Sequence, residues 1–349
     1  MKIYFSLIIL LFILSSCLEE VQIPTRLESA KLVVEGRITN EKPPYTVRLS
    51  YSGNQIYATD INLNLVVMGA RVVIVDDMGD STVLRPSFTE KGIYRTSDPN
   101  YIGKIGRSYS LKIDLKDGES YQSKPEKLTY CPPIDSLYGI YEDIINTSYP
   151  DGYRVYLDFK DPADTKNFYR WSAYGYSRVS KIGAGGLLDD ECSATNPFTG
   201  RGGFNVCWVP RYQTSIDLLS DVYFNGNIFR KKPVFYSPVY GTGQHLIEII
   251  QYSISRDTYQ FWKLYDEQSS RTGTIFDPLP APIQGNIINK NEANEYALGY
   301  FEVTGIYRKK IIINGKYDRS EIYLNALNFI PPEGGCSLPF SSCDRPIGW

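Results

Sequence analysis

Short runs in which apolar and polar residues alternate recur along the chain, and they constrain the fold more than any other feature. In residues 45–51 and 108–115, Tyr, Val, Leu or Ile occupies every second position, so one face of each run is apolar. A period of two is typical of half-buried β-strands. The chain has 29 Tyr, 28 Gly and 21 Pro but only 3 Met, a balance that favours strands and turns over helices. We therefore predict a mainly β fold.

The first half of the chain, residues 31–130, is predicted to form a small β-sandwich. About seven short strands fit into roughly 100 residues here, the density seen in sandwich domains. A proline pair at 43–44, an acidic glycine-containing turn at 76–80 and an Asp-Gly turn at 117–118 separate the strands. This pattern indicates an immunoglobulin-like or transthyretin-like domain.

Residues 134–349 are predicted to form a second domain, a larger antiparallel β domain with one packed helix. The boundary is set by the Cys-Pro-Pro sequence at 131–133, because two prolines cannot continue a central strand. We expect the strands of this domain at residues 155–159, 168–179, 245–253, 298–307 and 311–314.

One helix is expected directly after Ser255, which is a suitable N-cap residue. Apolar positions follow at i, i+3, i+4 and i+7, which predicts an amphipathic helix packed on the sheet. Gly273 is expected to end it. The apolar positions are Thr258, Phe261, Trp262 and Tyr265, with Leu264 widening the face.

The first sixteen residues have the pattern of a lipoprotein signal peptide. Lys2 supplies a short positive region, and residues 3–14 form an apolar run that is too short to span a membrane as a helix. Leu14-Ser15-Ser16-Cys17 then matches a bacterial lipobox, so we expect cleavage before Cys17 and acylation of its thiol. Residues 17–30 would form the lipidated tether. The alternative is an ordinary secretory signal with a chance cysteine.

The residues after Cys17 indicate where the anchored protein resides. Glu19 and Glu20 resemble the surface-export signal of Bacteroidetes lipoproteins, which predicts an outer-membrane protein that faces the cell exterior. The alternative is a solvated tether that is acidic by chance. The chain has 37 basic and 39 acidic side chains. It lacks the excess of basic residues with which proteins contact phosphates, so we do not expect it to bind nucleic acid.

Five cysteines follow Cys17, and their positions suggest two disulfides. Disulfides persist beyond the inner membrane, and in each proposed pair the two cysteines bracket a loop rich in Gly, Pro or Ser. We predict the pairs Cys192–Cys207 and Cys336–Cys343, which leaves Cys131 as a free thiol. A zinc site is the rival interpretation, but no Cys-x-x-Cys pair supports it.

No motif of catalysis, cofactor binding or metal binding emerges from the sequence. His245 is the single histidine, and no nucleophile motif accompanies it. The glycines at 183–186 lack the spacing of a phosphate-binding loop. The carboxylates at 189–191 could in principle serve glycoside hydrolysis, but they lie in a Gly-rich region bounded by the predicted disulfide, where solvated charge explains them better. The acidic turn at 76–80 lacks the alternating ligands of a calcium loop.

Several segments of the chain together carry a family resemblance: residues 32–36, 69–72, 92–94, 106–123, 259–262, 275–278, 283–287 and 298–301, with the paired C-terminal cysteines. In their order and spacing they resemble an uncharacterised Bacteroidetes lipoprotein family, domain of unknown function 4249. The resemblance implies an accessory surface lipoprotein beside a TonB-dependent outer-membrane transporter. The family has no established catalytic residues, so the resemblance assigns none to this chain. The alternatives are a structural surface lipoprotein without a small ligand and a hydrolase acting on glycan or peptide. We expect the contact surface in the loops of the second half, including residues 183–209.

Overall fold

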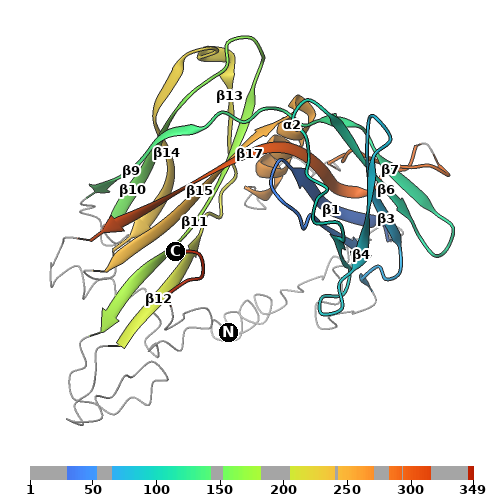
Figure 1. Cartoon of the computed structure of the whole chain (residues 1–349), viewed down its shortest axis with the longest axis horizontal. Coiled ribbons are helices and arrows are strands. Elements are labelled where there is room, and N and C mark those ends of the chain that lie inside the picture. Colours follow the sequence, from blue (N-terminus) through green and yellow to red (C-terminus); the bar gives the residue numbers. More distant parts are fainter. Residues whose placement is uncertain are drawn as a thin grey trace, which may run out of the picture.

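The computed structural model describes residues 30–52, 65–142, 152–181, 205–239, 243–270, 283–292, 294–315 and 345–349. This part of the chain is mainly β, with one packed α-helix, as the sequence predicts (Figure 1). The elements of the first half are β1 (Leu32–Thr39), β2 (Thr46–Tyr51), β3 (Arg71–Asp76), β4 (Ser81–Pro86), β5 (Ile93–Thr96), β6 (Ser108–Asp114), β7 (Ser120–Ser123) and β8 (Glu126–Lys127).

The second half supplies longer strands and the helix. Its elements are β9 (Ile134–Glu142), β10 (Gly152–Lys160), β11 (Phe168–Lys181), β12 (Asn205–Tyr212), β13 (Asp217–Ser220), the 3-10 helix η2 (Asp221–Tyr223), β14 (Ile228–Pro238), β15 (Gln244–Ile254), α2 (Arg256–Ser269), β16 (Ile287–Asn289) and β17 (Leu298–Asn314). None of the helices in the described part is long and apolar enough to cross a membrane.

Two sheets organise these strands. The larger one has 14 strands along the path β12-β11-β15-β17-β1-β2-β5-β4-β3-β6-β7-β16, with β13 beside β11 and β8 beside β6. The smaller sheet has the order β14-β10-β9. Neighbouring strands run antiparallel, except that β1 and β17 run parallel.

The first core lies inside the strands of the first half, which wrap around it. Its largest fully buried side chains include Tyr94 and Tyr109. The predicted hairpins are present: β3 and β4 meet through the turn at 76–80, and β6 and β7 through the turn at 117–118. Gly79 and Gly118 adopt positive φ in these turns, a conformation that glycine adopts without a steric penalty.

A second core lies between the small sheet and β11, β15 and β17. Phe159 occupies its centre, with ring centroids 4.9 Å from Tyr169 and 5.8 Å from Trp171. Aromatic pairs at these distances add to the stability that burial provides. The tyrosine-rich segment 168–179 forms one long strand, β11, in the middle of this arrangement.

Strand β17 joins the two halves and is the longest strand described (Figure 1). It merges the two strands predicted at 298–307 and 311–314. Its odd-numbered residues Phe301 and Val303 pack in the first core, while Tyr307 and Ile311 pack against the second. The first core thus contains residues that follow the predicted boundary at 131–133. Whether the halves fold independently stays a prediction.

Two asparagine side chains fasten β17 to neighbouring segments, one directly before β16 and one directly after β1. Asn286 exchanges two hydrogen bonds with the backbone of Phe301, at 2.8 and 2.9 Å. Asn40 does the same with the backbone of Ile306, at 3.2 and 2.7 Å. A side-chain amide used in this way satisfies one backbone N–H and one backbone C=O within the strand.

Helix α2 begins as predicted, because the Ser255 side chain accepts a hydrogen bond from the backbone N–H of Thr258 at 3.0 Å. It ends at Ser269, before the predicted stop at residue 273, which lies outside the described residues. Thr258 is buried and Trp262 packs on the sheet. Tyr265 and Leu264 differ from the expectation of a packed face, since each is 47% exposed. Only the start of the helix rests on the sheet, and its later turns extend beside a cleft.

Candidate functional site

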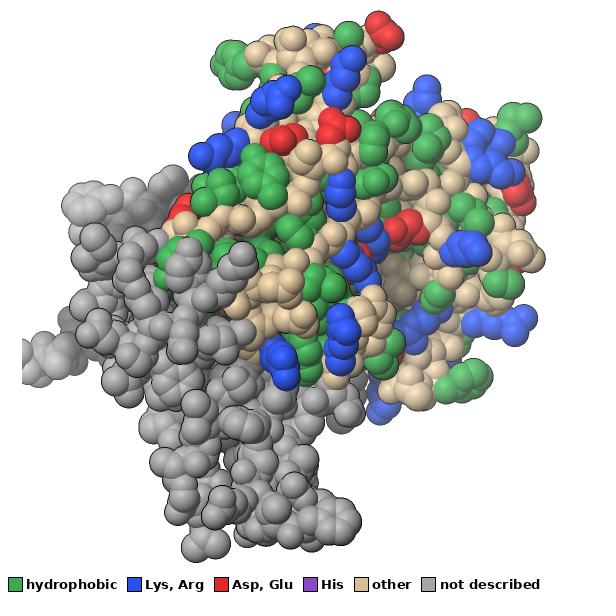
Figure 2. All heavy atoms as spheres, turned by 60° about the vertical axis from the view of Figure 1, so that its left-hand side comes forward, with side chains coloured by type: hydrophobic (Ala, Val, Ile, Leu, Met, Phe, Trp, Pro, Cys, Tyr) green, Lys and Arg blue, Asp and Glu red, His purple; other side chains and the backbone are tan. Residues whose placement is uncertain are grey.

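A cleft opens between α2 and the strands β1 and β17, on the face of the large sheet that points away from the two cores. Its volume of about 640 Å³ is in the range of small-molecule binding sites. Figure 2 shows Lys and Arg side chains across the middle of one face of the molecule, next to hydrophobic side chains. The cleft is lined by Glu35, Gly36, Arg37, Thr39, Glu41, Lys42, Pro44, Tyr45, Thr46, Arg48, Ile93, Phe261, Trp262, Tyr265, Gly299, Tyr300, Glu302, Ile306 and Arg308.

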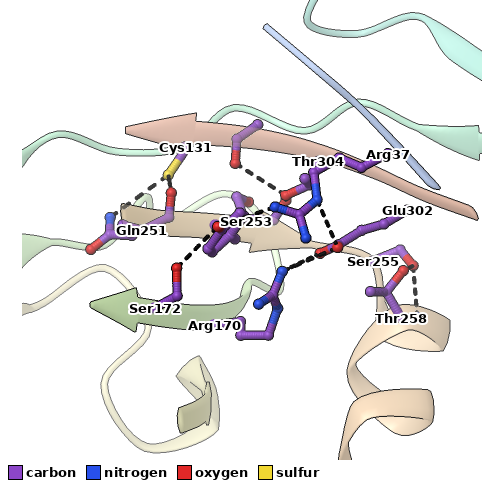
Figure 3. Close-up of polar contacts among 12 residues, drawn as sticks. Arg37, Cys131, Arg170, Ser172, Gln251, Ser253, Ser255, Thr258, Glu302 and Thr304 are labelled. Atoms are coloured by element: carbon purple, nitrogen blue, oxygen red, sulfur yellow. Dashed lines mark hydrogen bonds and ion pairs between the residues drawn. The ribbon is translucent and has the colours of Figure 1, made fainter. Parts of the chain in front are cut away.

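Arg37, Arg170 and Glu302 form an ionic cluster that we call the floor of the cleft (Figure 3). Arg37 and Glu302 line the cleft, and Arg170 pairs with Glu302 from β11. Arg170 on β11 donates from Nη2 to both carboxylate oxygens of Glu302, at 3.0 and 3.1 Å. Arg37 on β1 approaches the same carboxylate from the cleft side, with Nε 3.3 Å from Oε2. Burial by itself raises the pKa of Glu302, but the charges of Arg170 and Arg37 outweigh it and hold the pKa below its usual value.

The floor carries more positive than negative charge. Glu302 is 3% exposed and supplies one negative charge for the two guanidinium groups. The ring of Tyr252 stabilises both cations through cation–π contacts, since it lies 4.0 Å from Cζ of Arg170 and 4.9 Å from Cζ of Arg37. Trp262 contributes a second such contact, 4.8 Å from Cζ of Arg170.

Aromatic side chains form one wall of the cleft. Phe261 on α2 packs against Tyr300 of β17 with ring centroids 4.7 Å apart, and it stacks with Tyr265 at 6.5 Å and 27°. Trp262 contacts Tyr265 edge-on at 5.8 Å. The indole Nε1 of Trp262 is buried and has no hydrogen-bond partner within the described residues. The wall therefore offers flat apolar surface together with an unused donor.

A buried carboxylate holds this wall in place from behind. Glu126 on β8 accepts hydrogen bonds from the hydroxyls of Tyr300, Thr258 and Ser255, the last two at 2.9 and 3.2 Å. No cation neutralises it in the described part of the chain, and burial raises its pKa. Because Ser255 and Thr258 begin α2, this cluster fixes the start of the helix against the first half.

The rim of the cleft is charged. Arg308 on β17 pairs with Glu41 at 2.7 Å and lies 3.5 Å from Glu248. Lys42 and Arg48 are exposed, and within the described residues neither forms an ion pair. Glu35 lies opposite Arg48 in the register of β1 and β2.

The profile of one protein family matches residues 19–310, which cover most of the chain. The chain belongs to the family described as Domain of unknown function (DUF4249). This confirms the family resemblance seen in the sequence. A comparison with curated proteins finds no match. Because the family description assigns no activity, the functional argument for this DUF4249 chain depends on its own residues.

Most of the site residues predicted for the DUF4249 chain lie outside the described residues. This applies to Cys17 with the export signal Glu19 and Glu20, to three of the paired cysteines and to the loops at 183–186 and 189–191. Cys207 lies on β12 opposite Val179, but its side chain is likewise not described. The lipid anchor and the two disulfides stay predictions. The cysteines concerned are Cys192, Cys336 and Cys343.

Cys131 is described, and it is a free thiol. Its Sγ lies 3.4 Å from the backbone carbonyl oxygen of Gln251, deep beside the second core. Burial raises the pKa of this thiol to about 12, which keeps it in the unreactive protonated form. Cys131 therefore has a packing role in the described structure.

His245 is buried on β15 and faces the second core rather than the cleft. Its Nδ1 lies 2.7 Å from the Ser237 hydroxyl and 3.3 Å from the Ser177 hydroxyl, and its ring packs edge-on against Tyr153. Burial lowers its pKa to about 4. At 2% exposure, the imidazole has no access to a substrate.

The carboxylates of the acidic turn at 76–80 are paired with an arginine side chain of the same protein. Arg107 pairs with both Asp76 and Asp77, and Asp76 also accepts backbone hydrogen bonds from Met78 and Asp80. In the described residues, no group of three or more His, Cys, Asp or Glu side chains is arranged to hold a metal ion.

The three charged residues at the floor of the cleft were not predicted from the sequence. Arg37, Arg170 and Glu302 each lie within a strand whose neighbours are largely apolar or aromatic. A charged residue in such a run signals a buried ion pair when the strands are known to be adjacent. The parallel pairing of β1 with β17 supplies that information, and it joins residues almost 270 positions apart in register.

Proposed function

We propose that this protein is a non-catalytic binding or assembly accessory, anchored in the outer membrane through acylated Cys17 and facing the cell exterior. Its partner would be a TonB-dependent outer-membrane transporter. The lipobox and the acidic residues after it support the location. The transporter is the partner implied by the family resemblance.

The observation that carries the binding function is the cleft between α2, β1 and β17. Tyr265 remains 47% exposed beside Trp262 and Phe261, so aromatic surface stays open to solvent where the helix extends beyond its packing contacts. Such concave sites with aromatic walls and a few placed charges are typical of ligand binding. A purely structural lipoprotein has no need for this surface.

The chemistry of the cleft supports binding rather than hydrolysis. A glycoside hydrolase needs one carboxylic acid that can give up a proton and a second carboxylate at a set distance. Glu302 is held as an anion by Arg170 and Arg37, which occupy its oxygens. The single histidine is buried away from the cleft.

The location and the partnership are tested together by affinity purification through a C-terminal tag in mild detergent. We expect the wild-type protein to copurify with a large outer-membrane barrel. Cys17→Ala should release it from the membrane fraction, because acylation is lost, and should reduce copurification, because the anchor raises its concentration beside the barrel. Recovery of the wild-type protein alone, or retention of Cys17→Ala in the membrane, would contradict the proposal.

A further inference from the structure

We propose that the cleft binds a small ligand that carries a carboxylate next to a ring with an apolar face, aromatic or sugar, with Arg37 contacting the carboxylate and Trp262 and Tyr265 contacting the ring. This inference deepens the proposed binding function and rests on it. It concerns the chemical class of the ligand, which the family description does not assign.

The first argument is the unbalanced charge at the cleft floor. Arg170 donates from Nη2 to both oxygens of Glu302, and Arg37 shares that carboxylate, so a single negative charge serves two guanidinium groups. Arg37 donates from Nη1 to the Tyr252 hydroxyl at 3.1 Å and reaches Glu302 only through Nε. Its side chain is 39% exposed and lines the cleft, so part of its donor fork faces incoming solute.

The second argument is the set of unused donors around the same point. The Nε1 atom of Trp262 and the Nε atom of Arg170 are buried and have no hydrogen-bond partner within the described residues, and the Nε atom of Arg37 has only its ion pair with Glu302 at 3.3 Å. Unsatisfied buried donors cost stability, and acceptor oxygens placed among them would recover it. Arg37 and Trp262 both line the cleft, so a ligand can approach these two side chains.

The third argument concerns the kind of anion. The guanidinium fork of an arginine matches the two oxygens of a carboxylate, and the floor carries one surplus positive charge, which a carboxylate neutralises. Along the whole lining, the four cations Arg37, Lys42, Arg48 and Arg308 face three carboxylates. Binding of an anion is therefore favoured over binding of a cation.

The fourth argument concerns the rest of the ligand. Trp262, Phe261 and Tyr265 present ring faces and edges along one wall, within the reach of a group seated at Arg37. Rings of this kind stack on flat apolar surfaces, and the cleft volume of about 640 Å³ admits a ligand with one or two rings.

The test uses the purified full-length mature protein in mild detergent and two acidic probes. The aromatic probe is 4-hydroxyphenylacetate and the sugar probe is digalacturonate, and each is compared with its neutral methyl ester by saturation-transfer NMR and titration calorimetry. We expect at least one acid to bind about tenfold more tightly than its ester, which is the discrimination that one charge-assisted hydrogen-bonded pair provides. The two probes distinguish an aromatic acid from a sugar acid.

Variants assign the preference to the cleft. Arg37→Gln should remove the preference for the acid over the ester, and Arg37→Lys should retain only part of it because the planar fork is lost. Tyr265→Ala should weaken the acid and the ester to the same extent, because it removes only ring contact. Arg85→Gln changes an exposed arginine on β4 outside the cleft, so it is the matched control with wild-type binding.

Equal affinity for acid and ester, or no binding of either pair, overturns the inference. So does an acid preference that survives in Arg37→Gln. Thermal melts accompany each titration, and Arg37→Lys retains the charge if Arg37→Gln fails to fold. Failure of the wider functional proposal is a different result, because it is measured as copurification with a transporter and does not depend on the probes.

Discussion

The two faces of strand β15 bury polar side chains of opposite character. The inner face, toward the second core, holds His245 and Gln251, whereas the cleft face holds Glu248 and Tyr252. Both faces belong to the same strand and are covered by other elements. The inner groups are uncharged, and the groups on the cleft face form a network of ions.

On the inner face, polar groups are matched to neutral partners. Gln251 accepts from the Trp171 indole at 3.0 Å and donates to the Pro132 carbonyl at 2.8 Å, and His245 is paired with Ser237. Such a network gives a core a unique arrangement without the cost of buried charge. Gln251 is 0% and His245 2% exposed, so neither side chain presents a donor to solvent.

On the cleft face, the Tyr252 ring contacts the guanidinium groups of both Arg37 and Arg170. The two arginines share Glu302 (Figure 3). This arrangement retains a surplus positive charge and unused donors. Two guanidinium groups that share one buried carboxylate are costly to bury, and perturbed charged groups of this kind cluster at functional sites. The difference between the faces therefore favours the cleft side as the binding surface that we propose.

The largest predicted effect comes from removing the negative charge of the cleft network. Glu302→Gln should lower the free energy of unfolding by about 3–5 kcal/mol, because Arg170 and Arg37 would lose the carboxylate they share. Chemical denaturation at pH 7 measures this loss. Glu35→Gln, on the paired strand β1 but exposed, is the control and should change stability by less than about 0.5 kcal/mol. Equal effects in the two variants would refute the distinction.

The second prediction concerns the neutral inner face and its response to acid. Folded His245 has a pKa of about 4, below its ordinary value of 6.5, so the unfolded chain takes up the proton first as the pH falls. The contribution of His245 is therefore complete above pH 6.5 and is lost progressively toward pH 4, by roughly 3 kcal/mol. His245→Asn should be less stable at pH 7 but should lack this pH-dependent loss.

Denaturation midpoints of the wild type and His245→Asn at pH 7, 5.5 and 4 test this pH dependence. The stability difference between the two proteins should shrink as the pH falls, because only the wild type loses the histidine contribution. A difference that stays constant across this range would show that His245 titrates alike in the folded and unfolded states. The inner face would then tolerate charge, contrary to the comparison.

Much of the fold was predictable from the sequence because alternation and turn chemistry are local signals. The hairpins at 76–80 and 117–118 and the cap at Ser255 were found in this way. The union of β1 with β17 was not predictable, since a parallel pair between distant segments leaves no local pattern. The cleft depends on that pair, so Arg37 and Glu302 were not recognised as neighbours.

The smallest predicted effect separates two influences on Glu126, which lies beside the start of α2. A helix N-terminus favours an anion, but burial raises the pKa of this carboxyl above its ordinary value of 4.5. Its contribution to stability is therefore complete below pH 4.5 and is lost as the pH rises through the raised pKa. Glu126→Gln retains a carbonyl acceptor for Tyr300 and removes the charge, so it should be more stable than wild type at pH 8 and within about 0.5 kcal/mol of it at pH 4. Urea denaturation at both pH values measures this. A variant that is less stable than wild type at pH 8 would show that the helix start stabilises an anionic Glu126, so that the ionic character of the cleft face extends behind its aromatic wall.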